Sequence, residues 1–309
     1  MQLILGIDGG GTRTRARLAD DNGKPLGTGE AGSSNMQAQG EAAAQHEILN
    51  AIANAFADAG IPPTPIHAAC LGLAGAARPD ERALFTTWAK QFICAHATVI
   101  SDGELVLAAG TPALWGIALI AGTGSIAWGK TQAGRMARAG GWGYLLGDEG
   151  SGYDLARAAL RAAAQAADGR GAPTQLLEAF LQHWQLPNPQ ALIPKVYRPA
   201  FTRAEIAQLA PLVVAQAMQG DAVASDIVQA GAQALAQAVL AVARSLALPA
   251  LLVPTPLALT GGLLLNAALV REQVLQQLRI SEINFDPITL VHEPVNGAVR
   301  IAQQYQEAV

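Results

Sequence analysis

The chain has 309 residues and a formal net charge of −4, with 51% hydrophobic residues, 14% charged residues and two cysteines. This composition excludes a disordered chain and a disulfide scaffold, and the negative balance gives no field that would recruit nucleic acid. We expect about two domains from this length, since one domain commonly has on the order of 150 residues.

The first predicted elements are an apolar strand and a glycine turn. Leu3–Ile7 is an apolar run, followed by Asp8, by three glycines at 9–11 and by Thr12. Glycines let the backbone turn tightly and approach a ligand closely, and backbone N–H groups with a hydroxyl can face phosphate oxygens. An aspartate at a strand end can face a hydrated cation. The pattern indicates a site for nucleotide phosphate and a metal ion, and an ordinary hairpin stays the alternative.

A strand over residues 13–19 follows the turn. Its residues alternate strictly, with Arg13, Arg15 and Arg17 on one face. We interpret this face as a solvated strand surface and not a nucleic-acid stripe, because no aromatic residues lie between the arginines. A turn over 21–24 and a third strand over 26–29 complete the group.

Helices and strands then alternate. We expect a helix over 40–59, a strand over 66–73 that ends in the glycines of 72–75, a helix over 79–92 and a strand over 98–100. Asp102 follows the last of these strands, where a helix begins. Its carboxylate is a candidate functional group, and a plain helix cap is the alternative.

The opening pattern recurs in the middle of the chain. An apolar strand over 116–121 is followed by a Gly-Thr-Gly-Ser turn over 122–125 and a return strand over 126–130. The recurrence predicts two related domains. We expect an N-terminal domain over 1–112, completed by a C-terminal helix over 297–309, and a second domain over 113–296.

The second half of the chain is predicted to be mostly helical. A glycine-rich loop over 139–152 holds the acid pair Asp148-Glu149. The apolar stretch 230–259 is interrupted by glutamine, arginine and proline, which predicts a buried helix and then a loop or strand, not a membrane span. A third strand with a glycine turn ends at Gly261-Gly262, and a last helix covers 296–305. We expect a cytoplasmic protein without a membrane partner.

Several of these motifs together resemble the superfamily of actin-like ATPases and sugar kinases. The segments that resemble its phosphate-1, connecting, phosphate-2 and adenosine motifs are 8–12, Asp102, 119–125 and 259–262. Those that resemble its N-acetylglucosamine and glucosamine kinase branch, within the BadF-type ATPase family, are 33–35, 140–143 and 147–151. The resemblance is specific from residue 3 to about residue 154 and weaker over residues 155–255. It is specific again at the adenosine motif.

The resemblance implies an α/β fold of two actin-like, ribonuclease H-like domains. Each would have a central mixed sheet, with nucleotide and sugar in the cleft between the domains. The implied activity is an ATP-dependent kinase of an amino sugar, N-acetylglucosamine or glucosamine, acting at the 6-hydroxyl with Mg²⁺. A homodimer is also implied.

The resemblance assigns roles to motif residues as well. Asp102 would be the catalytic base, and Asp8 would hold Mg²⁺ through water. The residues implied to contact ATP are Asp8, Gly9, Gly10, Gly11, Thr12, Gly122, Thr123, Gly124, Gly261 and Gly262. Those implied to contact the amino sugar are Asn35, Ser125, Gly141, Trp142, Gly143 and Asp148.

Structural alternatives stay open for some of these residues. Trp142 could be core packing, and Asn35 could be a turn former. Asp148 and Glu149 could be acids that compensate the dipole of the next helix.

Two competing functions remain at this point. One is an ATPase that activates a 2-hydroxyacyl-CoA dehydratase, a class in which cysteines hold an iron–sulfur cluster at a dimer interface. This chain has no cysteine after Cys94, and Cys70 lies in an apolar strand. The other is a non-catalytic, actin-like assembly module, which would need no sugar site.

Overall fold

The computed structural model of the protein describes residues 2–74, 76, 79–111, 113–198, 201–248 and 253–307. The chain forms two compact units: unit 1 comprises Met1–Gly116 and Val291–Val309, and unit 2 comprises Ile117–Leu290. The glycine predicted at position 75 and the domain boundary predicted at residue 112 lie outside the described residues.

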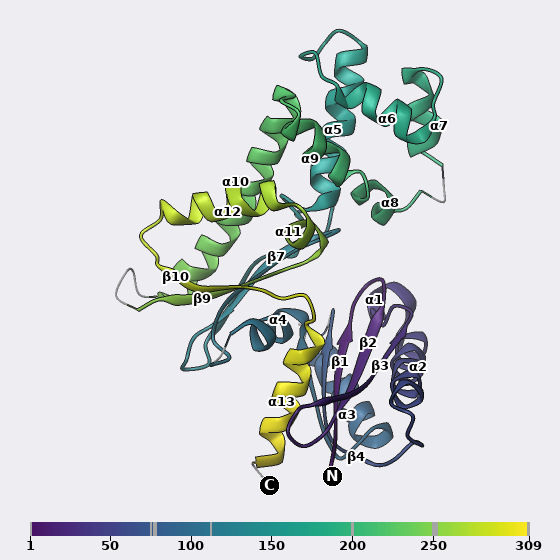
Figure 1. The fold of residues 1–309 in the computed structure, drawn as a ribbon, viewed down its shortest axis with the longest axis vertical. Helices are drawn as coiled ribbons and strands as arrows, with labels where there is room; N and C mark the ends of the chain where they lie inside the picture. Colours follow the sequence, from purple (N-terminus) through teal and green to yellow (C-terminus); the bar gives the residue numbers. More distant parts are fainter. Residues whose placement is uncertain are drawn as a thin grey trace. The chain divides into compact units, whose positions relative to one another are not determined.

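Unit 1 contains a five-stranded mixed sheet, sheet A, with the strand order β3-β2-β1-β4-β5 (Figure 1). β1 pairs antiparallel with β2 and parallel with β4, and β4 pairs parallel with β5. The elements of unit 1 are β1 (Leu3–Gly9), β2 (Thr14–Ala19), β3 (Pro25–Ala31), α1 (Met36–Gln39), α2 (Glu41–Ala59), β4 (Ile66–Leu73), α3 (Pro79–Phe92), β5 (His96–Ser101), α4 (Asp102–Gly110) and α13 (Val295–Glu307).

Both faces of β1 are buried, which explains why its residues from Leu3 to Ile7 are apolar. Leu5 and Ile7 belong to a core cluster with residues of α2 and α3. Ile4 points to the opposite face, into a second cluster with residues of α4 and α13. Gly6 lies on that second face, where an added Cβ would come within 2.8 Å of Val299, so the C-terminal helix packs directly on the strand.

Unit 2 contains sheet B, with the order β10-β9-β6-β7-β8. β6 pairs parallel with β9, β9 parallel with β10, and β7 antiparallel with β8. The elements of unit 2 are β6 (Gly116–Ala121), β7 (Ser125–Lys130), β8 (Met136–Gly140), α5 (Gly152–Ala167), α6 (Leu176–Trp184), the 3₁₀ helix η1 (Pro189–Ala191), α7 (Leu192–Val196), α8 (Arg203–Ala207), α9 (Ala210–Met218), α10 (Ala222–Ser245), β9 (Thr255–Thr260), α11 (Gly262–Asn266), α12 (Ala268–Arg279) and β10 (Phe285–Leu290).

The two sheets repeat one another. Each has a first strand, an antiparallel pair of strands that follows it in the chain, and two later strands on its other side. The predicted fold class, α/β with a central mixed sheet in each of two related units, is confirmed. In both sheets the glycine turn directly follows the first strand, so each turn lies at that strand's carboxyl end, where open α/β sheets bind ligands.

α10 has the length and apolar composition that a membrane span would need, by those criteria alone. Its residues Val228, Leu235 and Val239 are buried in the core of unit 2, together with residues of α5, α9 and α12. The predicted buried helix is confirmed, although it begins eight residues before position 230, with Asp221 as its N-cap.

The prediction that the arginine face of β2 is solvated is wrong for Arg17. The residue is 8% exposed, and its guanidinium donates to both carboxylate oxygens of Glu293, at 3.1 and 3.0 Å, and to Asn296. The chain returns to unit 1 at residue 291 and brings Glu293 and the start of α13 onto β2. The alternation of residues within β2 cannot indicate that a segment near the C-terminus packs on its arginine face.

Two elements of unit 2, α12 and β10, were not predicted from the sequence. In α12 the buried residues Val270, Val274 and Leu278 recur every four positions, a helical pattern without strong end signals. β10 is the edge strand of sheet B and contains Pro287, a residue that argues against a strand except at an edge.

Candidate active site

The glycine turn of unit 1 joins β1 to β2 and is closed by a hydrogen bond from Gly10 N to the Arg13 carbonyl, at 2.9 Å. A Cβ at Gly9 would lie 2.3 Å from Ser34 Oγ and 2.6 Å from Leu73 Cδ2. No side chain fits there, so this turn presents bare backbone. Thr12 is exposed beside it.

Asp8 and Asp102 lie at the same end of sheet A. Asp8 is in register with Gly72 of β4, which is in register with Ile100 of β5, two residues before Asp102. Burial first, and then the negative charge of Asp102, raise the pKa of Asp8 from 3.8 to about 6. Burial also raises the pKa of Asp102. Two carboxylates that interact electrostatically form an electronegative site, which suits a hydrated divalent cation.

Asp102 is not the cap of the helix that it begins. Ser101 is the N-cap of α4: its hydroxyl accepts from Glu104 N at 3.3 Å, and the Glu104 carboxylate accepts from Ser101 N at 3.0 Å. The carboxylate of Asp102 accepts local hydrogen bonds from Gly103 N, at 2.9 Å, and from its own backbone N–H. The helix-cap alternative for Asp102 is therefore wrong, and this carboxylate keeps acceptor capacity for a ligand.

Asn35 lies beside the same glycine turn. Ser33 Oγ donates to the Gly10 carbonyl at 3.2 Å and accepts from Asn35 N at 3.2 Å. A Cβ at Gly11 would come within 4.0 Å of Asn35 Nδ2. The structure thus brings the 33–35 segment to the phosphate-type turn.

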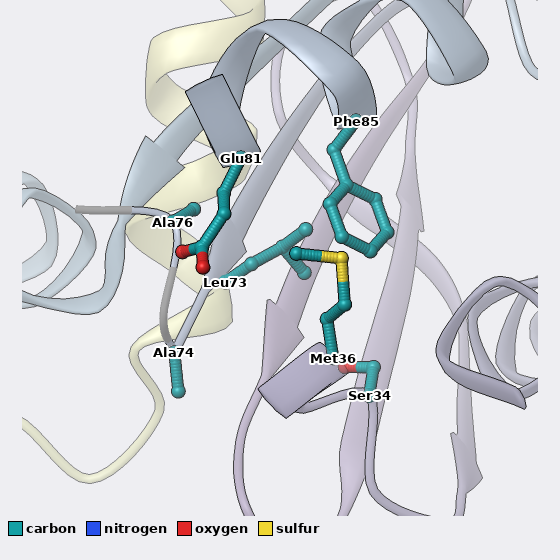
Figure 2. Close-up of a pocket in the computed structure, with 7 residues that line it drawn as sticks. All are labelled: Ser34, Met36, Leu73, Ala74, Ala76, Glu81 and Phe85. Atoms are coloured by element: carbon teal, nitrogen blue, oxygen red, sulfur yellow. The ribbon is translucent and has the colours of Figure 1, made fainter. Parts of the chain in front are cut away.

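Behind this segment unit 1 has a small cavity of about 10 Å³, the size that holds one water molecule. Figure 2 shows Ser34 and Glu81 on opposite sides of it, with Met36, Leu73 and Phe85 as apolar walls. The Ser34 hydroxyl is buried and has no hydrogen-bond partner among the described residues.

In unit 2, the turns after β6 and β9 lie against each other. Gly122 N donates to the Gly124 carbonyl at 2.9 Å, which closes the turn that holds Thr123. A Cβ at Gly122 would lie 3.5 Å from Gly262 N. Gly261 has φ of 97°, and a Cβ there would lie 2.3 Å from the Ala121 carbonyl, so only glycine fits. The predicted phosphate-2 and adenosine turns are therefore neighbours.

A second group in unit 2 forms around Asp148. Its side chain is buried, its φ is 62°, and its Oδ1 accepts from Ser125 N at 3.1 Å. A Cβ at Gly124 would lie 2.8 Å from that same carboxylate oxygen. Gly141 N donates to the Ser125 carbonyl at 3.0 Å, which joins the glycine loop to the start of β7.

The helix-dipole alternative for Asp148 and Glu149 loses support here. Ser151 is the N-cap of α5, and the first-turn acid of that helix is Asp154. The Asp148 carboxylate instead points back to Ser125. Glu149 is exposed, and its carbonyl accepts from Ser125 Oγ at 2.8 Å.

Trp142 is 65% exposed, so the core-packing alternative is wrong for this residue. The guanidinium of Arg138 lies 5.0 Å from the centroid of its ring. Gly143, with φ of 81°, follows it in the loop. An exposed aromatic face beside buried polar acceptors is suited to stacking on a sugar ring.

Among the described residues, no three His, Cys, Asp or Glu side chains gather as they would around a directly ligated metal ion. The donor set at Asp8 and Asp102 fits a hard cation held through water. Arg203, which was not singled out from the sequence, contacts Asp148 of the glycine-rich loop. Nothing local in the sequence signals this contact, because Arg203 comes from α8. Tyr144, in the loop itself, packs on Tyr153 of α5.

Comparison with known proteins extends over nearly the whole chain. An N-acetylmuramic acid/N-acetylglucosamine kinase of Clostridium acetobutylicum is 31% identical, over 98% of this chain and 99% of the relative. An N-acetyl-D-glucosamine kinase of Dictyostelium discoideum is 30% identical, over 97% of this chain and 98% of the relative. A solved structure from Chromobacterium violaceum, provisionally named an N-acetylglucosamine kinase, is 30% identical and has a TM-score of 0.79, covering 98% of this chain and 99% of its own.

The family profile of the BadF/BadG/BcrA/BcrD ATPases matches residues 5–302, which include both glycine turns, both candidate carboxylate groups and most of α13. The chain therefore belongs to the BadF/BadG/BcrA/BcrD ATPase family.

Proposed function

We propose that the protein is an ATP-dependent kinase that phosphorylates an amino sugar, N-acetylglucosamine or glucosamine, at the 6-hydroxyl. The observation that carries this proposal is Asp102: a carboxylate with a raised pKa, not the N-cap of the helix that it begins, at the same sheet end as Asp8 and the first glycine turn. Phosphoryl transfer to a hydroxyl needs one acceptor for the hydroxyl proton, together with positioning and charge neutralisation.

Asp102 would accept the proton of the sugar hydroxyl as its oxygen attacks the terminal phosphorus of ATP. The raised pKa brings the carboxylate closer to the operating pH, where a general base is most effective. Asp8 would orient a hydrated Mg²⁺. When bound, this ion neutralises charge on the transferred phosphoryl group and its leaving oxygen. The neighbouring ion would also offset the repulsion between the two carboxylates.

The nucleotide would be held mainly by backbone. The turn of Gly9, Gly10 and Gly11 and the turn of Gly122 and Gly124 would offer N–H groups to phosphate oxygens, with Thr12 and Thr123 adding hydroxyls. Gly261 and Gly262 would lie along the adenosine, where a bare backbone permits close approach.

The sugar would be held by polar acceptors and one aromatic face. Asp148 would accept hydrogen bonds from the sugar, Asn35 would accept from or donate to its hydroxyls or 2-amino substituent, and Trp142 would stack on the ring. The other residues that we assign to this site are Ser125, Gly141 and Gly143. The relatives named as kinases of N-acetylglucosamine support this choice of substrate class.

An ATPase that activates a dehydratase is disfavoured. Such a protein needs cysteines for an iron–sulfur cluster, and Cys70 is buried in sheet A with a pKa raised by burial. Only Cys94 is partly exposed. A cytoplasmic location and a homodimer are part of the proposal.

A coupled assay of ADP release tests the function. ADP release should depend on sugar and be largest with N-acetylglucosamine or glucosamine, compared with N-acetylmannosamine, glucose and no sugar, and the product should carry its phosphate on O6. Asp102→Asn should abolish sugar-dependent release and still bind ATP, whereas the exposed Asp226→Asn control should match the wild type. ATP turnover that no sugar changes would show that the proposal is wrong.

A further inference from the structure

Arg203 begins α8 and contacts the glycine-rich loop at two points. Its Nη1 lies 3.8 Å from Asp148 Oδ2. Its guanidinium carbon lies 5.3 Å from the centroid of the Tyr144 ring. One side chain from a separate helical segment therefore touches both the candidate sugar acceptor and the loop that carries it.

Asp148 needs such a partner. Its side chain is 7% exposed, and its backbone has a positive φ of 62°, a conformation that a residue with a side chain adopts only when its surroundings hold it. Ser125 N satisfies Oδ1, at 3.1 Å. The second oxygen, Oδ2, faces Arg203. A buried carboxylate with no cation or donor on one oxygen would be costly.

Arg203 is itself held in place from two sides. Thr202 and Glu205 form a capping box that fixes the start of α8. Tyr144 packs edge-to-face on Tyr153 of α5, with ring centroids 5.5 Å apart, so the ring beneath the guanidinium is anchored on a long helix. A planar guanidinium can stack on an aromatic face and pair with a carboxylate at the same time, which an ammonium does less well.

We propose that Arg203 is a positioning residue of the amino-sugar site, which acts through Asp148. It holds Oδ2 of the carboxylate and clamps the loop through Tyr144. A carboxylate has about four lone-pair sites, so Asp148 can accept further hydrogen bonds. With its side chain held in this way, the free sites stay oriented toward the sugar. This inference rests on the proposed function, which assigns Asp148 to the sugar.

Three variants test it by steady-state kinetics with sugar and ATP varied separately. Arg203→Met keeps an apolar stem near Tyr144 and removes the charge. It should raise the sugar KM by about 5-fold or more, because the partner is buried, and leave the ATP KM unchanged. Arg203→Lys restores the cation but not the planar guanidinium over Tyr144, so its sugar KM should lie between those of the wild type and Arg203→Met.

Arg198→Met is the matched control. Arg198 is exposed in the same segment and pairs with Glu205 of α8, but it has no contact with the 141–150 loop among those found in the described residues. It should leave both KM values unchanged. Equal effects of Arg198→Met and Arg203→Met would assign the loss to the stability of α8 and overturn the inference. So would an unchanged sugar KM in Arg203→Met, an ATP KM that rises in parallel, or no recovery in Arg203→Lys.

The wild type separates this inference from the proposed function. If the wild type releases ADP without any dependence on sugar, the proposed function fails. If the wild type is a sugar kinase and Arg203→Met keeps its sugar KM, only the role of Arg203 fails.

Discussion

Asp8, at the end of β1, and Asp102, directly after β5, lie close enough to interact electrostatically although β4 separates their strands. Burial and then the charge of Asp102 raise the pKa of Asp8 to about 6. The charge state of Asp102 thus alters the protonation of Asp8.

This coupling predicts how binding of Mg²⁺-ATP responds to pH. Affinity should fall below about pH 6 in the wild type, because Asp8 takes up a proton and no longer attracts the cation. In Asp102→Asn the midpoint should move to lower pH, since one cause of the raised pKa is removed while burial remains. Calorimetry from pH 5 to 8 would measure the affinity of both proteins for Mg²⁺-ATP. Protonation of ATP itself affects both proteins equally and cancels in the comparison. A midpoint that stays in place in Asp102→Asn would contradict the coupling.

The same shift predicts a gain in stability from Asp8→Asn. The folded-state pKa of Asp8, about 6, lies above the ordinary value of 3.8. Its contribution to stability is therefore fully present below about pH 4 and is lost as the pH rises through about 6. A neutral amide avoids that loss, so at pH 7 Asp8→Asn should be more stable by on the order of 2–3 kcal/mol, and inactive.

Urea unfolding of wild type and Asp8→Asn at pH 4 and pH 7 would measure this gain. The two proteins should differ at pH 7 and converge at pH 4. Asp226→Asn, an exposed position on α10, should match the wild type at both pH values. An Asp8→Asn protein that is less stable than the wild type at pH 7 would show that the native Asp8 carboxylate is not destabilised by its surroundings.

Two glycines of one turn should affect different substrates. A Cβ at Gly124 would lie 2.8 Å from Asp148 Oδ1, so Gly124→Ala must displace that carboxylate. The nearest atom to a Cβ at Gly122 is Gly262 N, at an ordinary 3.5 Å. Gly124→Ala should therefore raise the sugar KM by roughly 10-fold, a loss of about 1.4 kcal/mol in binding. Gly122→Ala should act mainly on the ATP KM, through the adenosine turn. Steady-state kinetics would decide, and equal changes of both constants in both variants would contradict this separation.

The elements around the glycine turns could be predicted from the sequence because their signals are local. β4 and α3 have the predicted bounds, since β4 is an apolar run that ends among glycines and α3 begins at a proline. The repeat of strand, glycine turn and strand also predicts two like sheets. The site residues Asp8, Asn35, Asp102 and Asp148 could be nominated in the same way, and their assignment to ligands stays a prediction.

What the sequence could not provide is contact between distant segments. The burial of Arg17 depends on Glu293, and the contact of Asp148 with Arg203 depends on where α8 packs. The exposure of Trp142 was also beyond local patterns, because a glycine-rich loop has no periodicity that would indicate which side chains are covered. β10 carries a proline that local rules count against a strand.

The ion pair of Arg17 and Glu293 should matter more for stability than a surface pair does. Arg17 is 9% exposed at its side chain and Glu293 is 45% exposed. Glu293→Gln removes the negative charge and one of two acceptor oxygens beside this buried guanidinium, which keeps Asn296 and Thr28 as its other acceptors among the described residues. We expect Glu293→Gln to lower the free energy of unfolding by about 1–3 kcal/mol. This loss is smaller than for a fully buried ion pair, because Glu293 is partly exposed to solvent. The double variant Arg17→Met/Glu293→Gln should recover part of this loss, since it removes the buried charge as well.

Urea unfolding at pH 7 would measure the single and double variants. The control is Glu30→Gln, which breaks the more exposed pair with Arg15 and should cost under about 1 kcal/mol. Hydrogen bonds from Arg17 lower the pKa of Glu293, so the stabilisation by this pair is present above the ordinary value of 4.5 and is lost as the pH falls through the lowered one. The difference between wild type and Glu293→Gln should therefore shrink below pH 4.5. A double variant as unstable as the sum of its two single variants would show that Arg17 and Glu293 do not act as a pair.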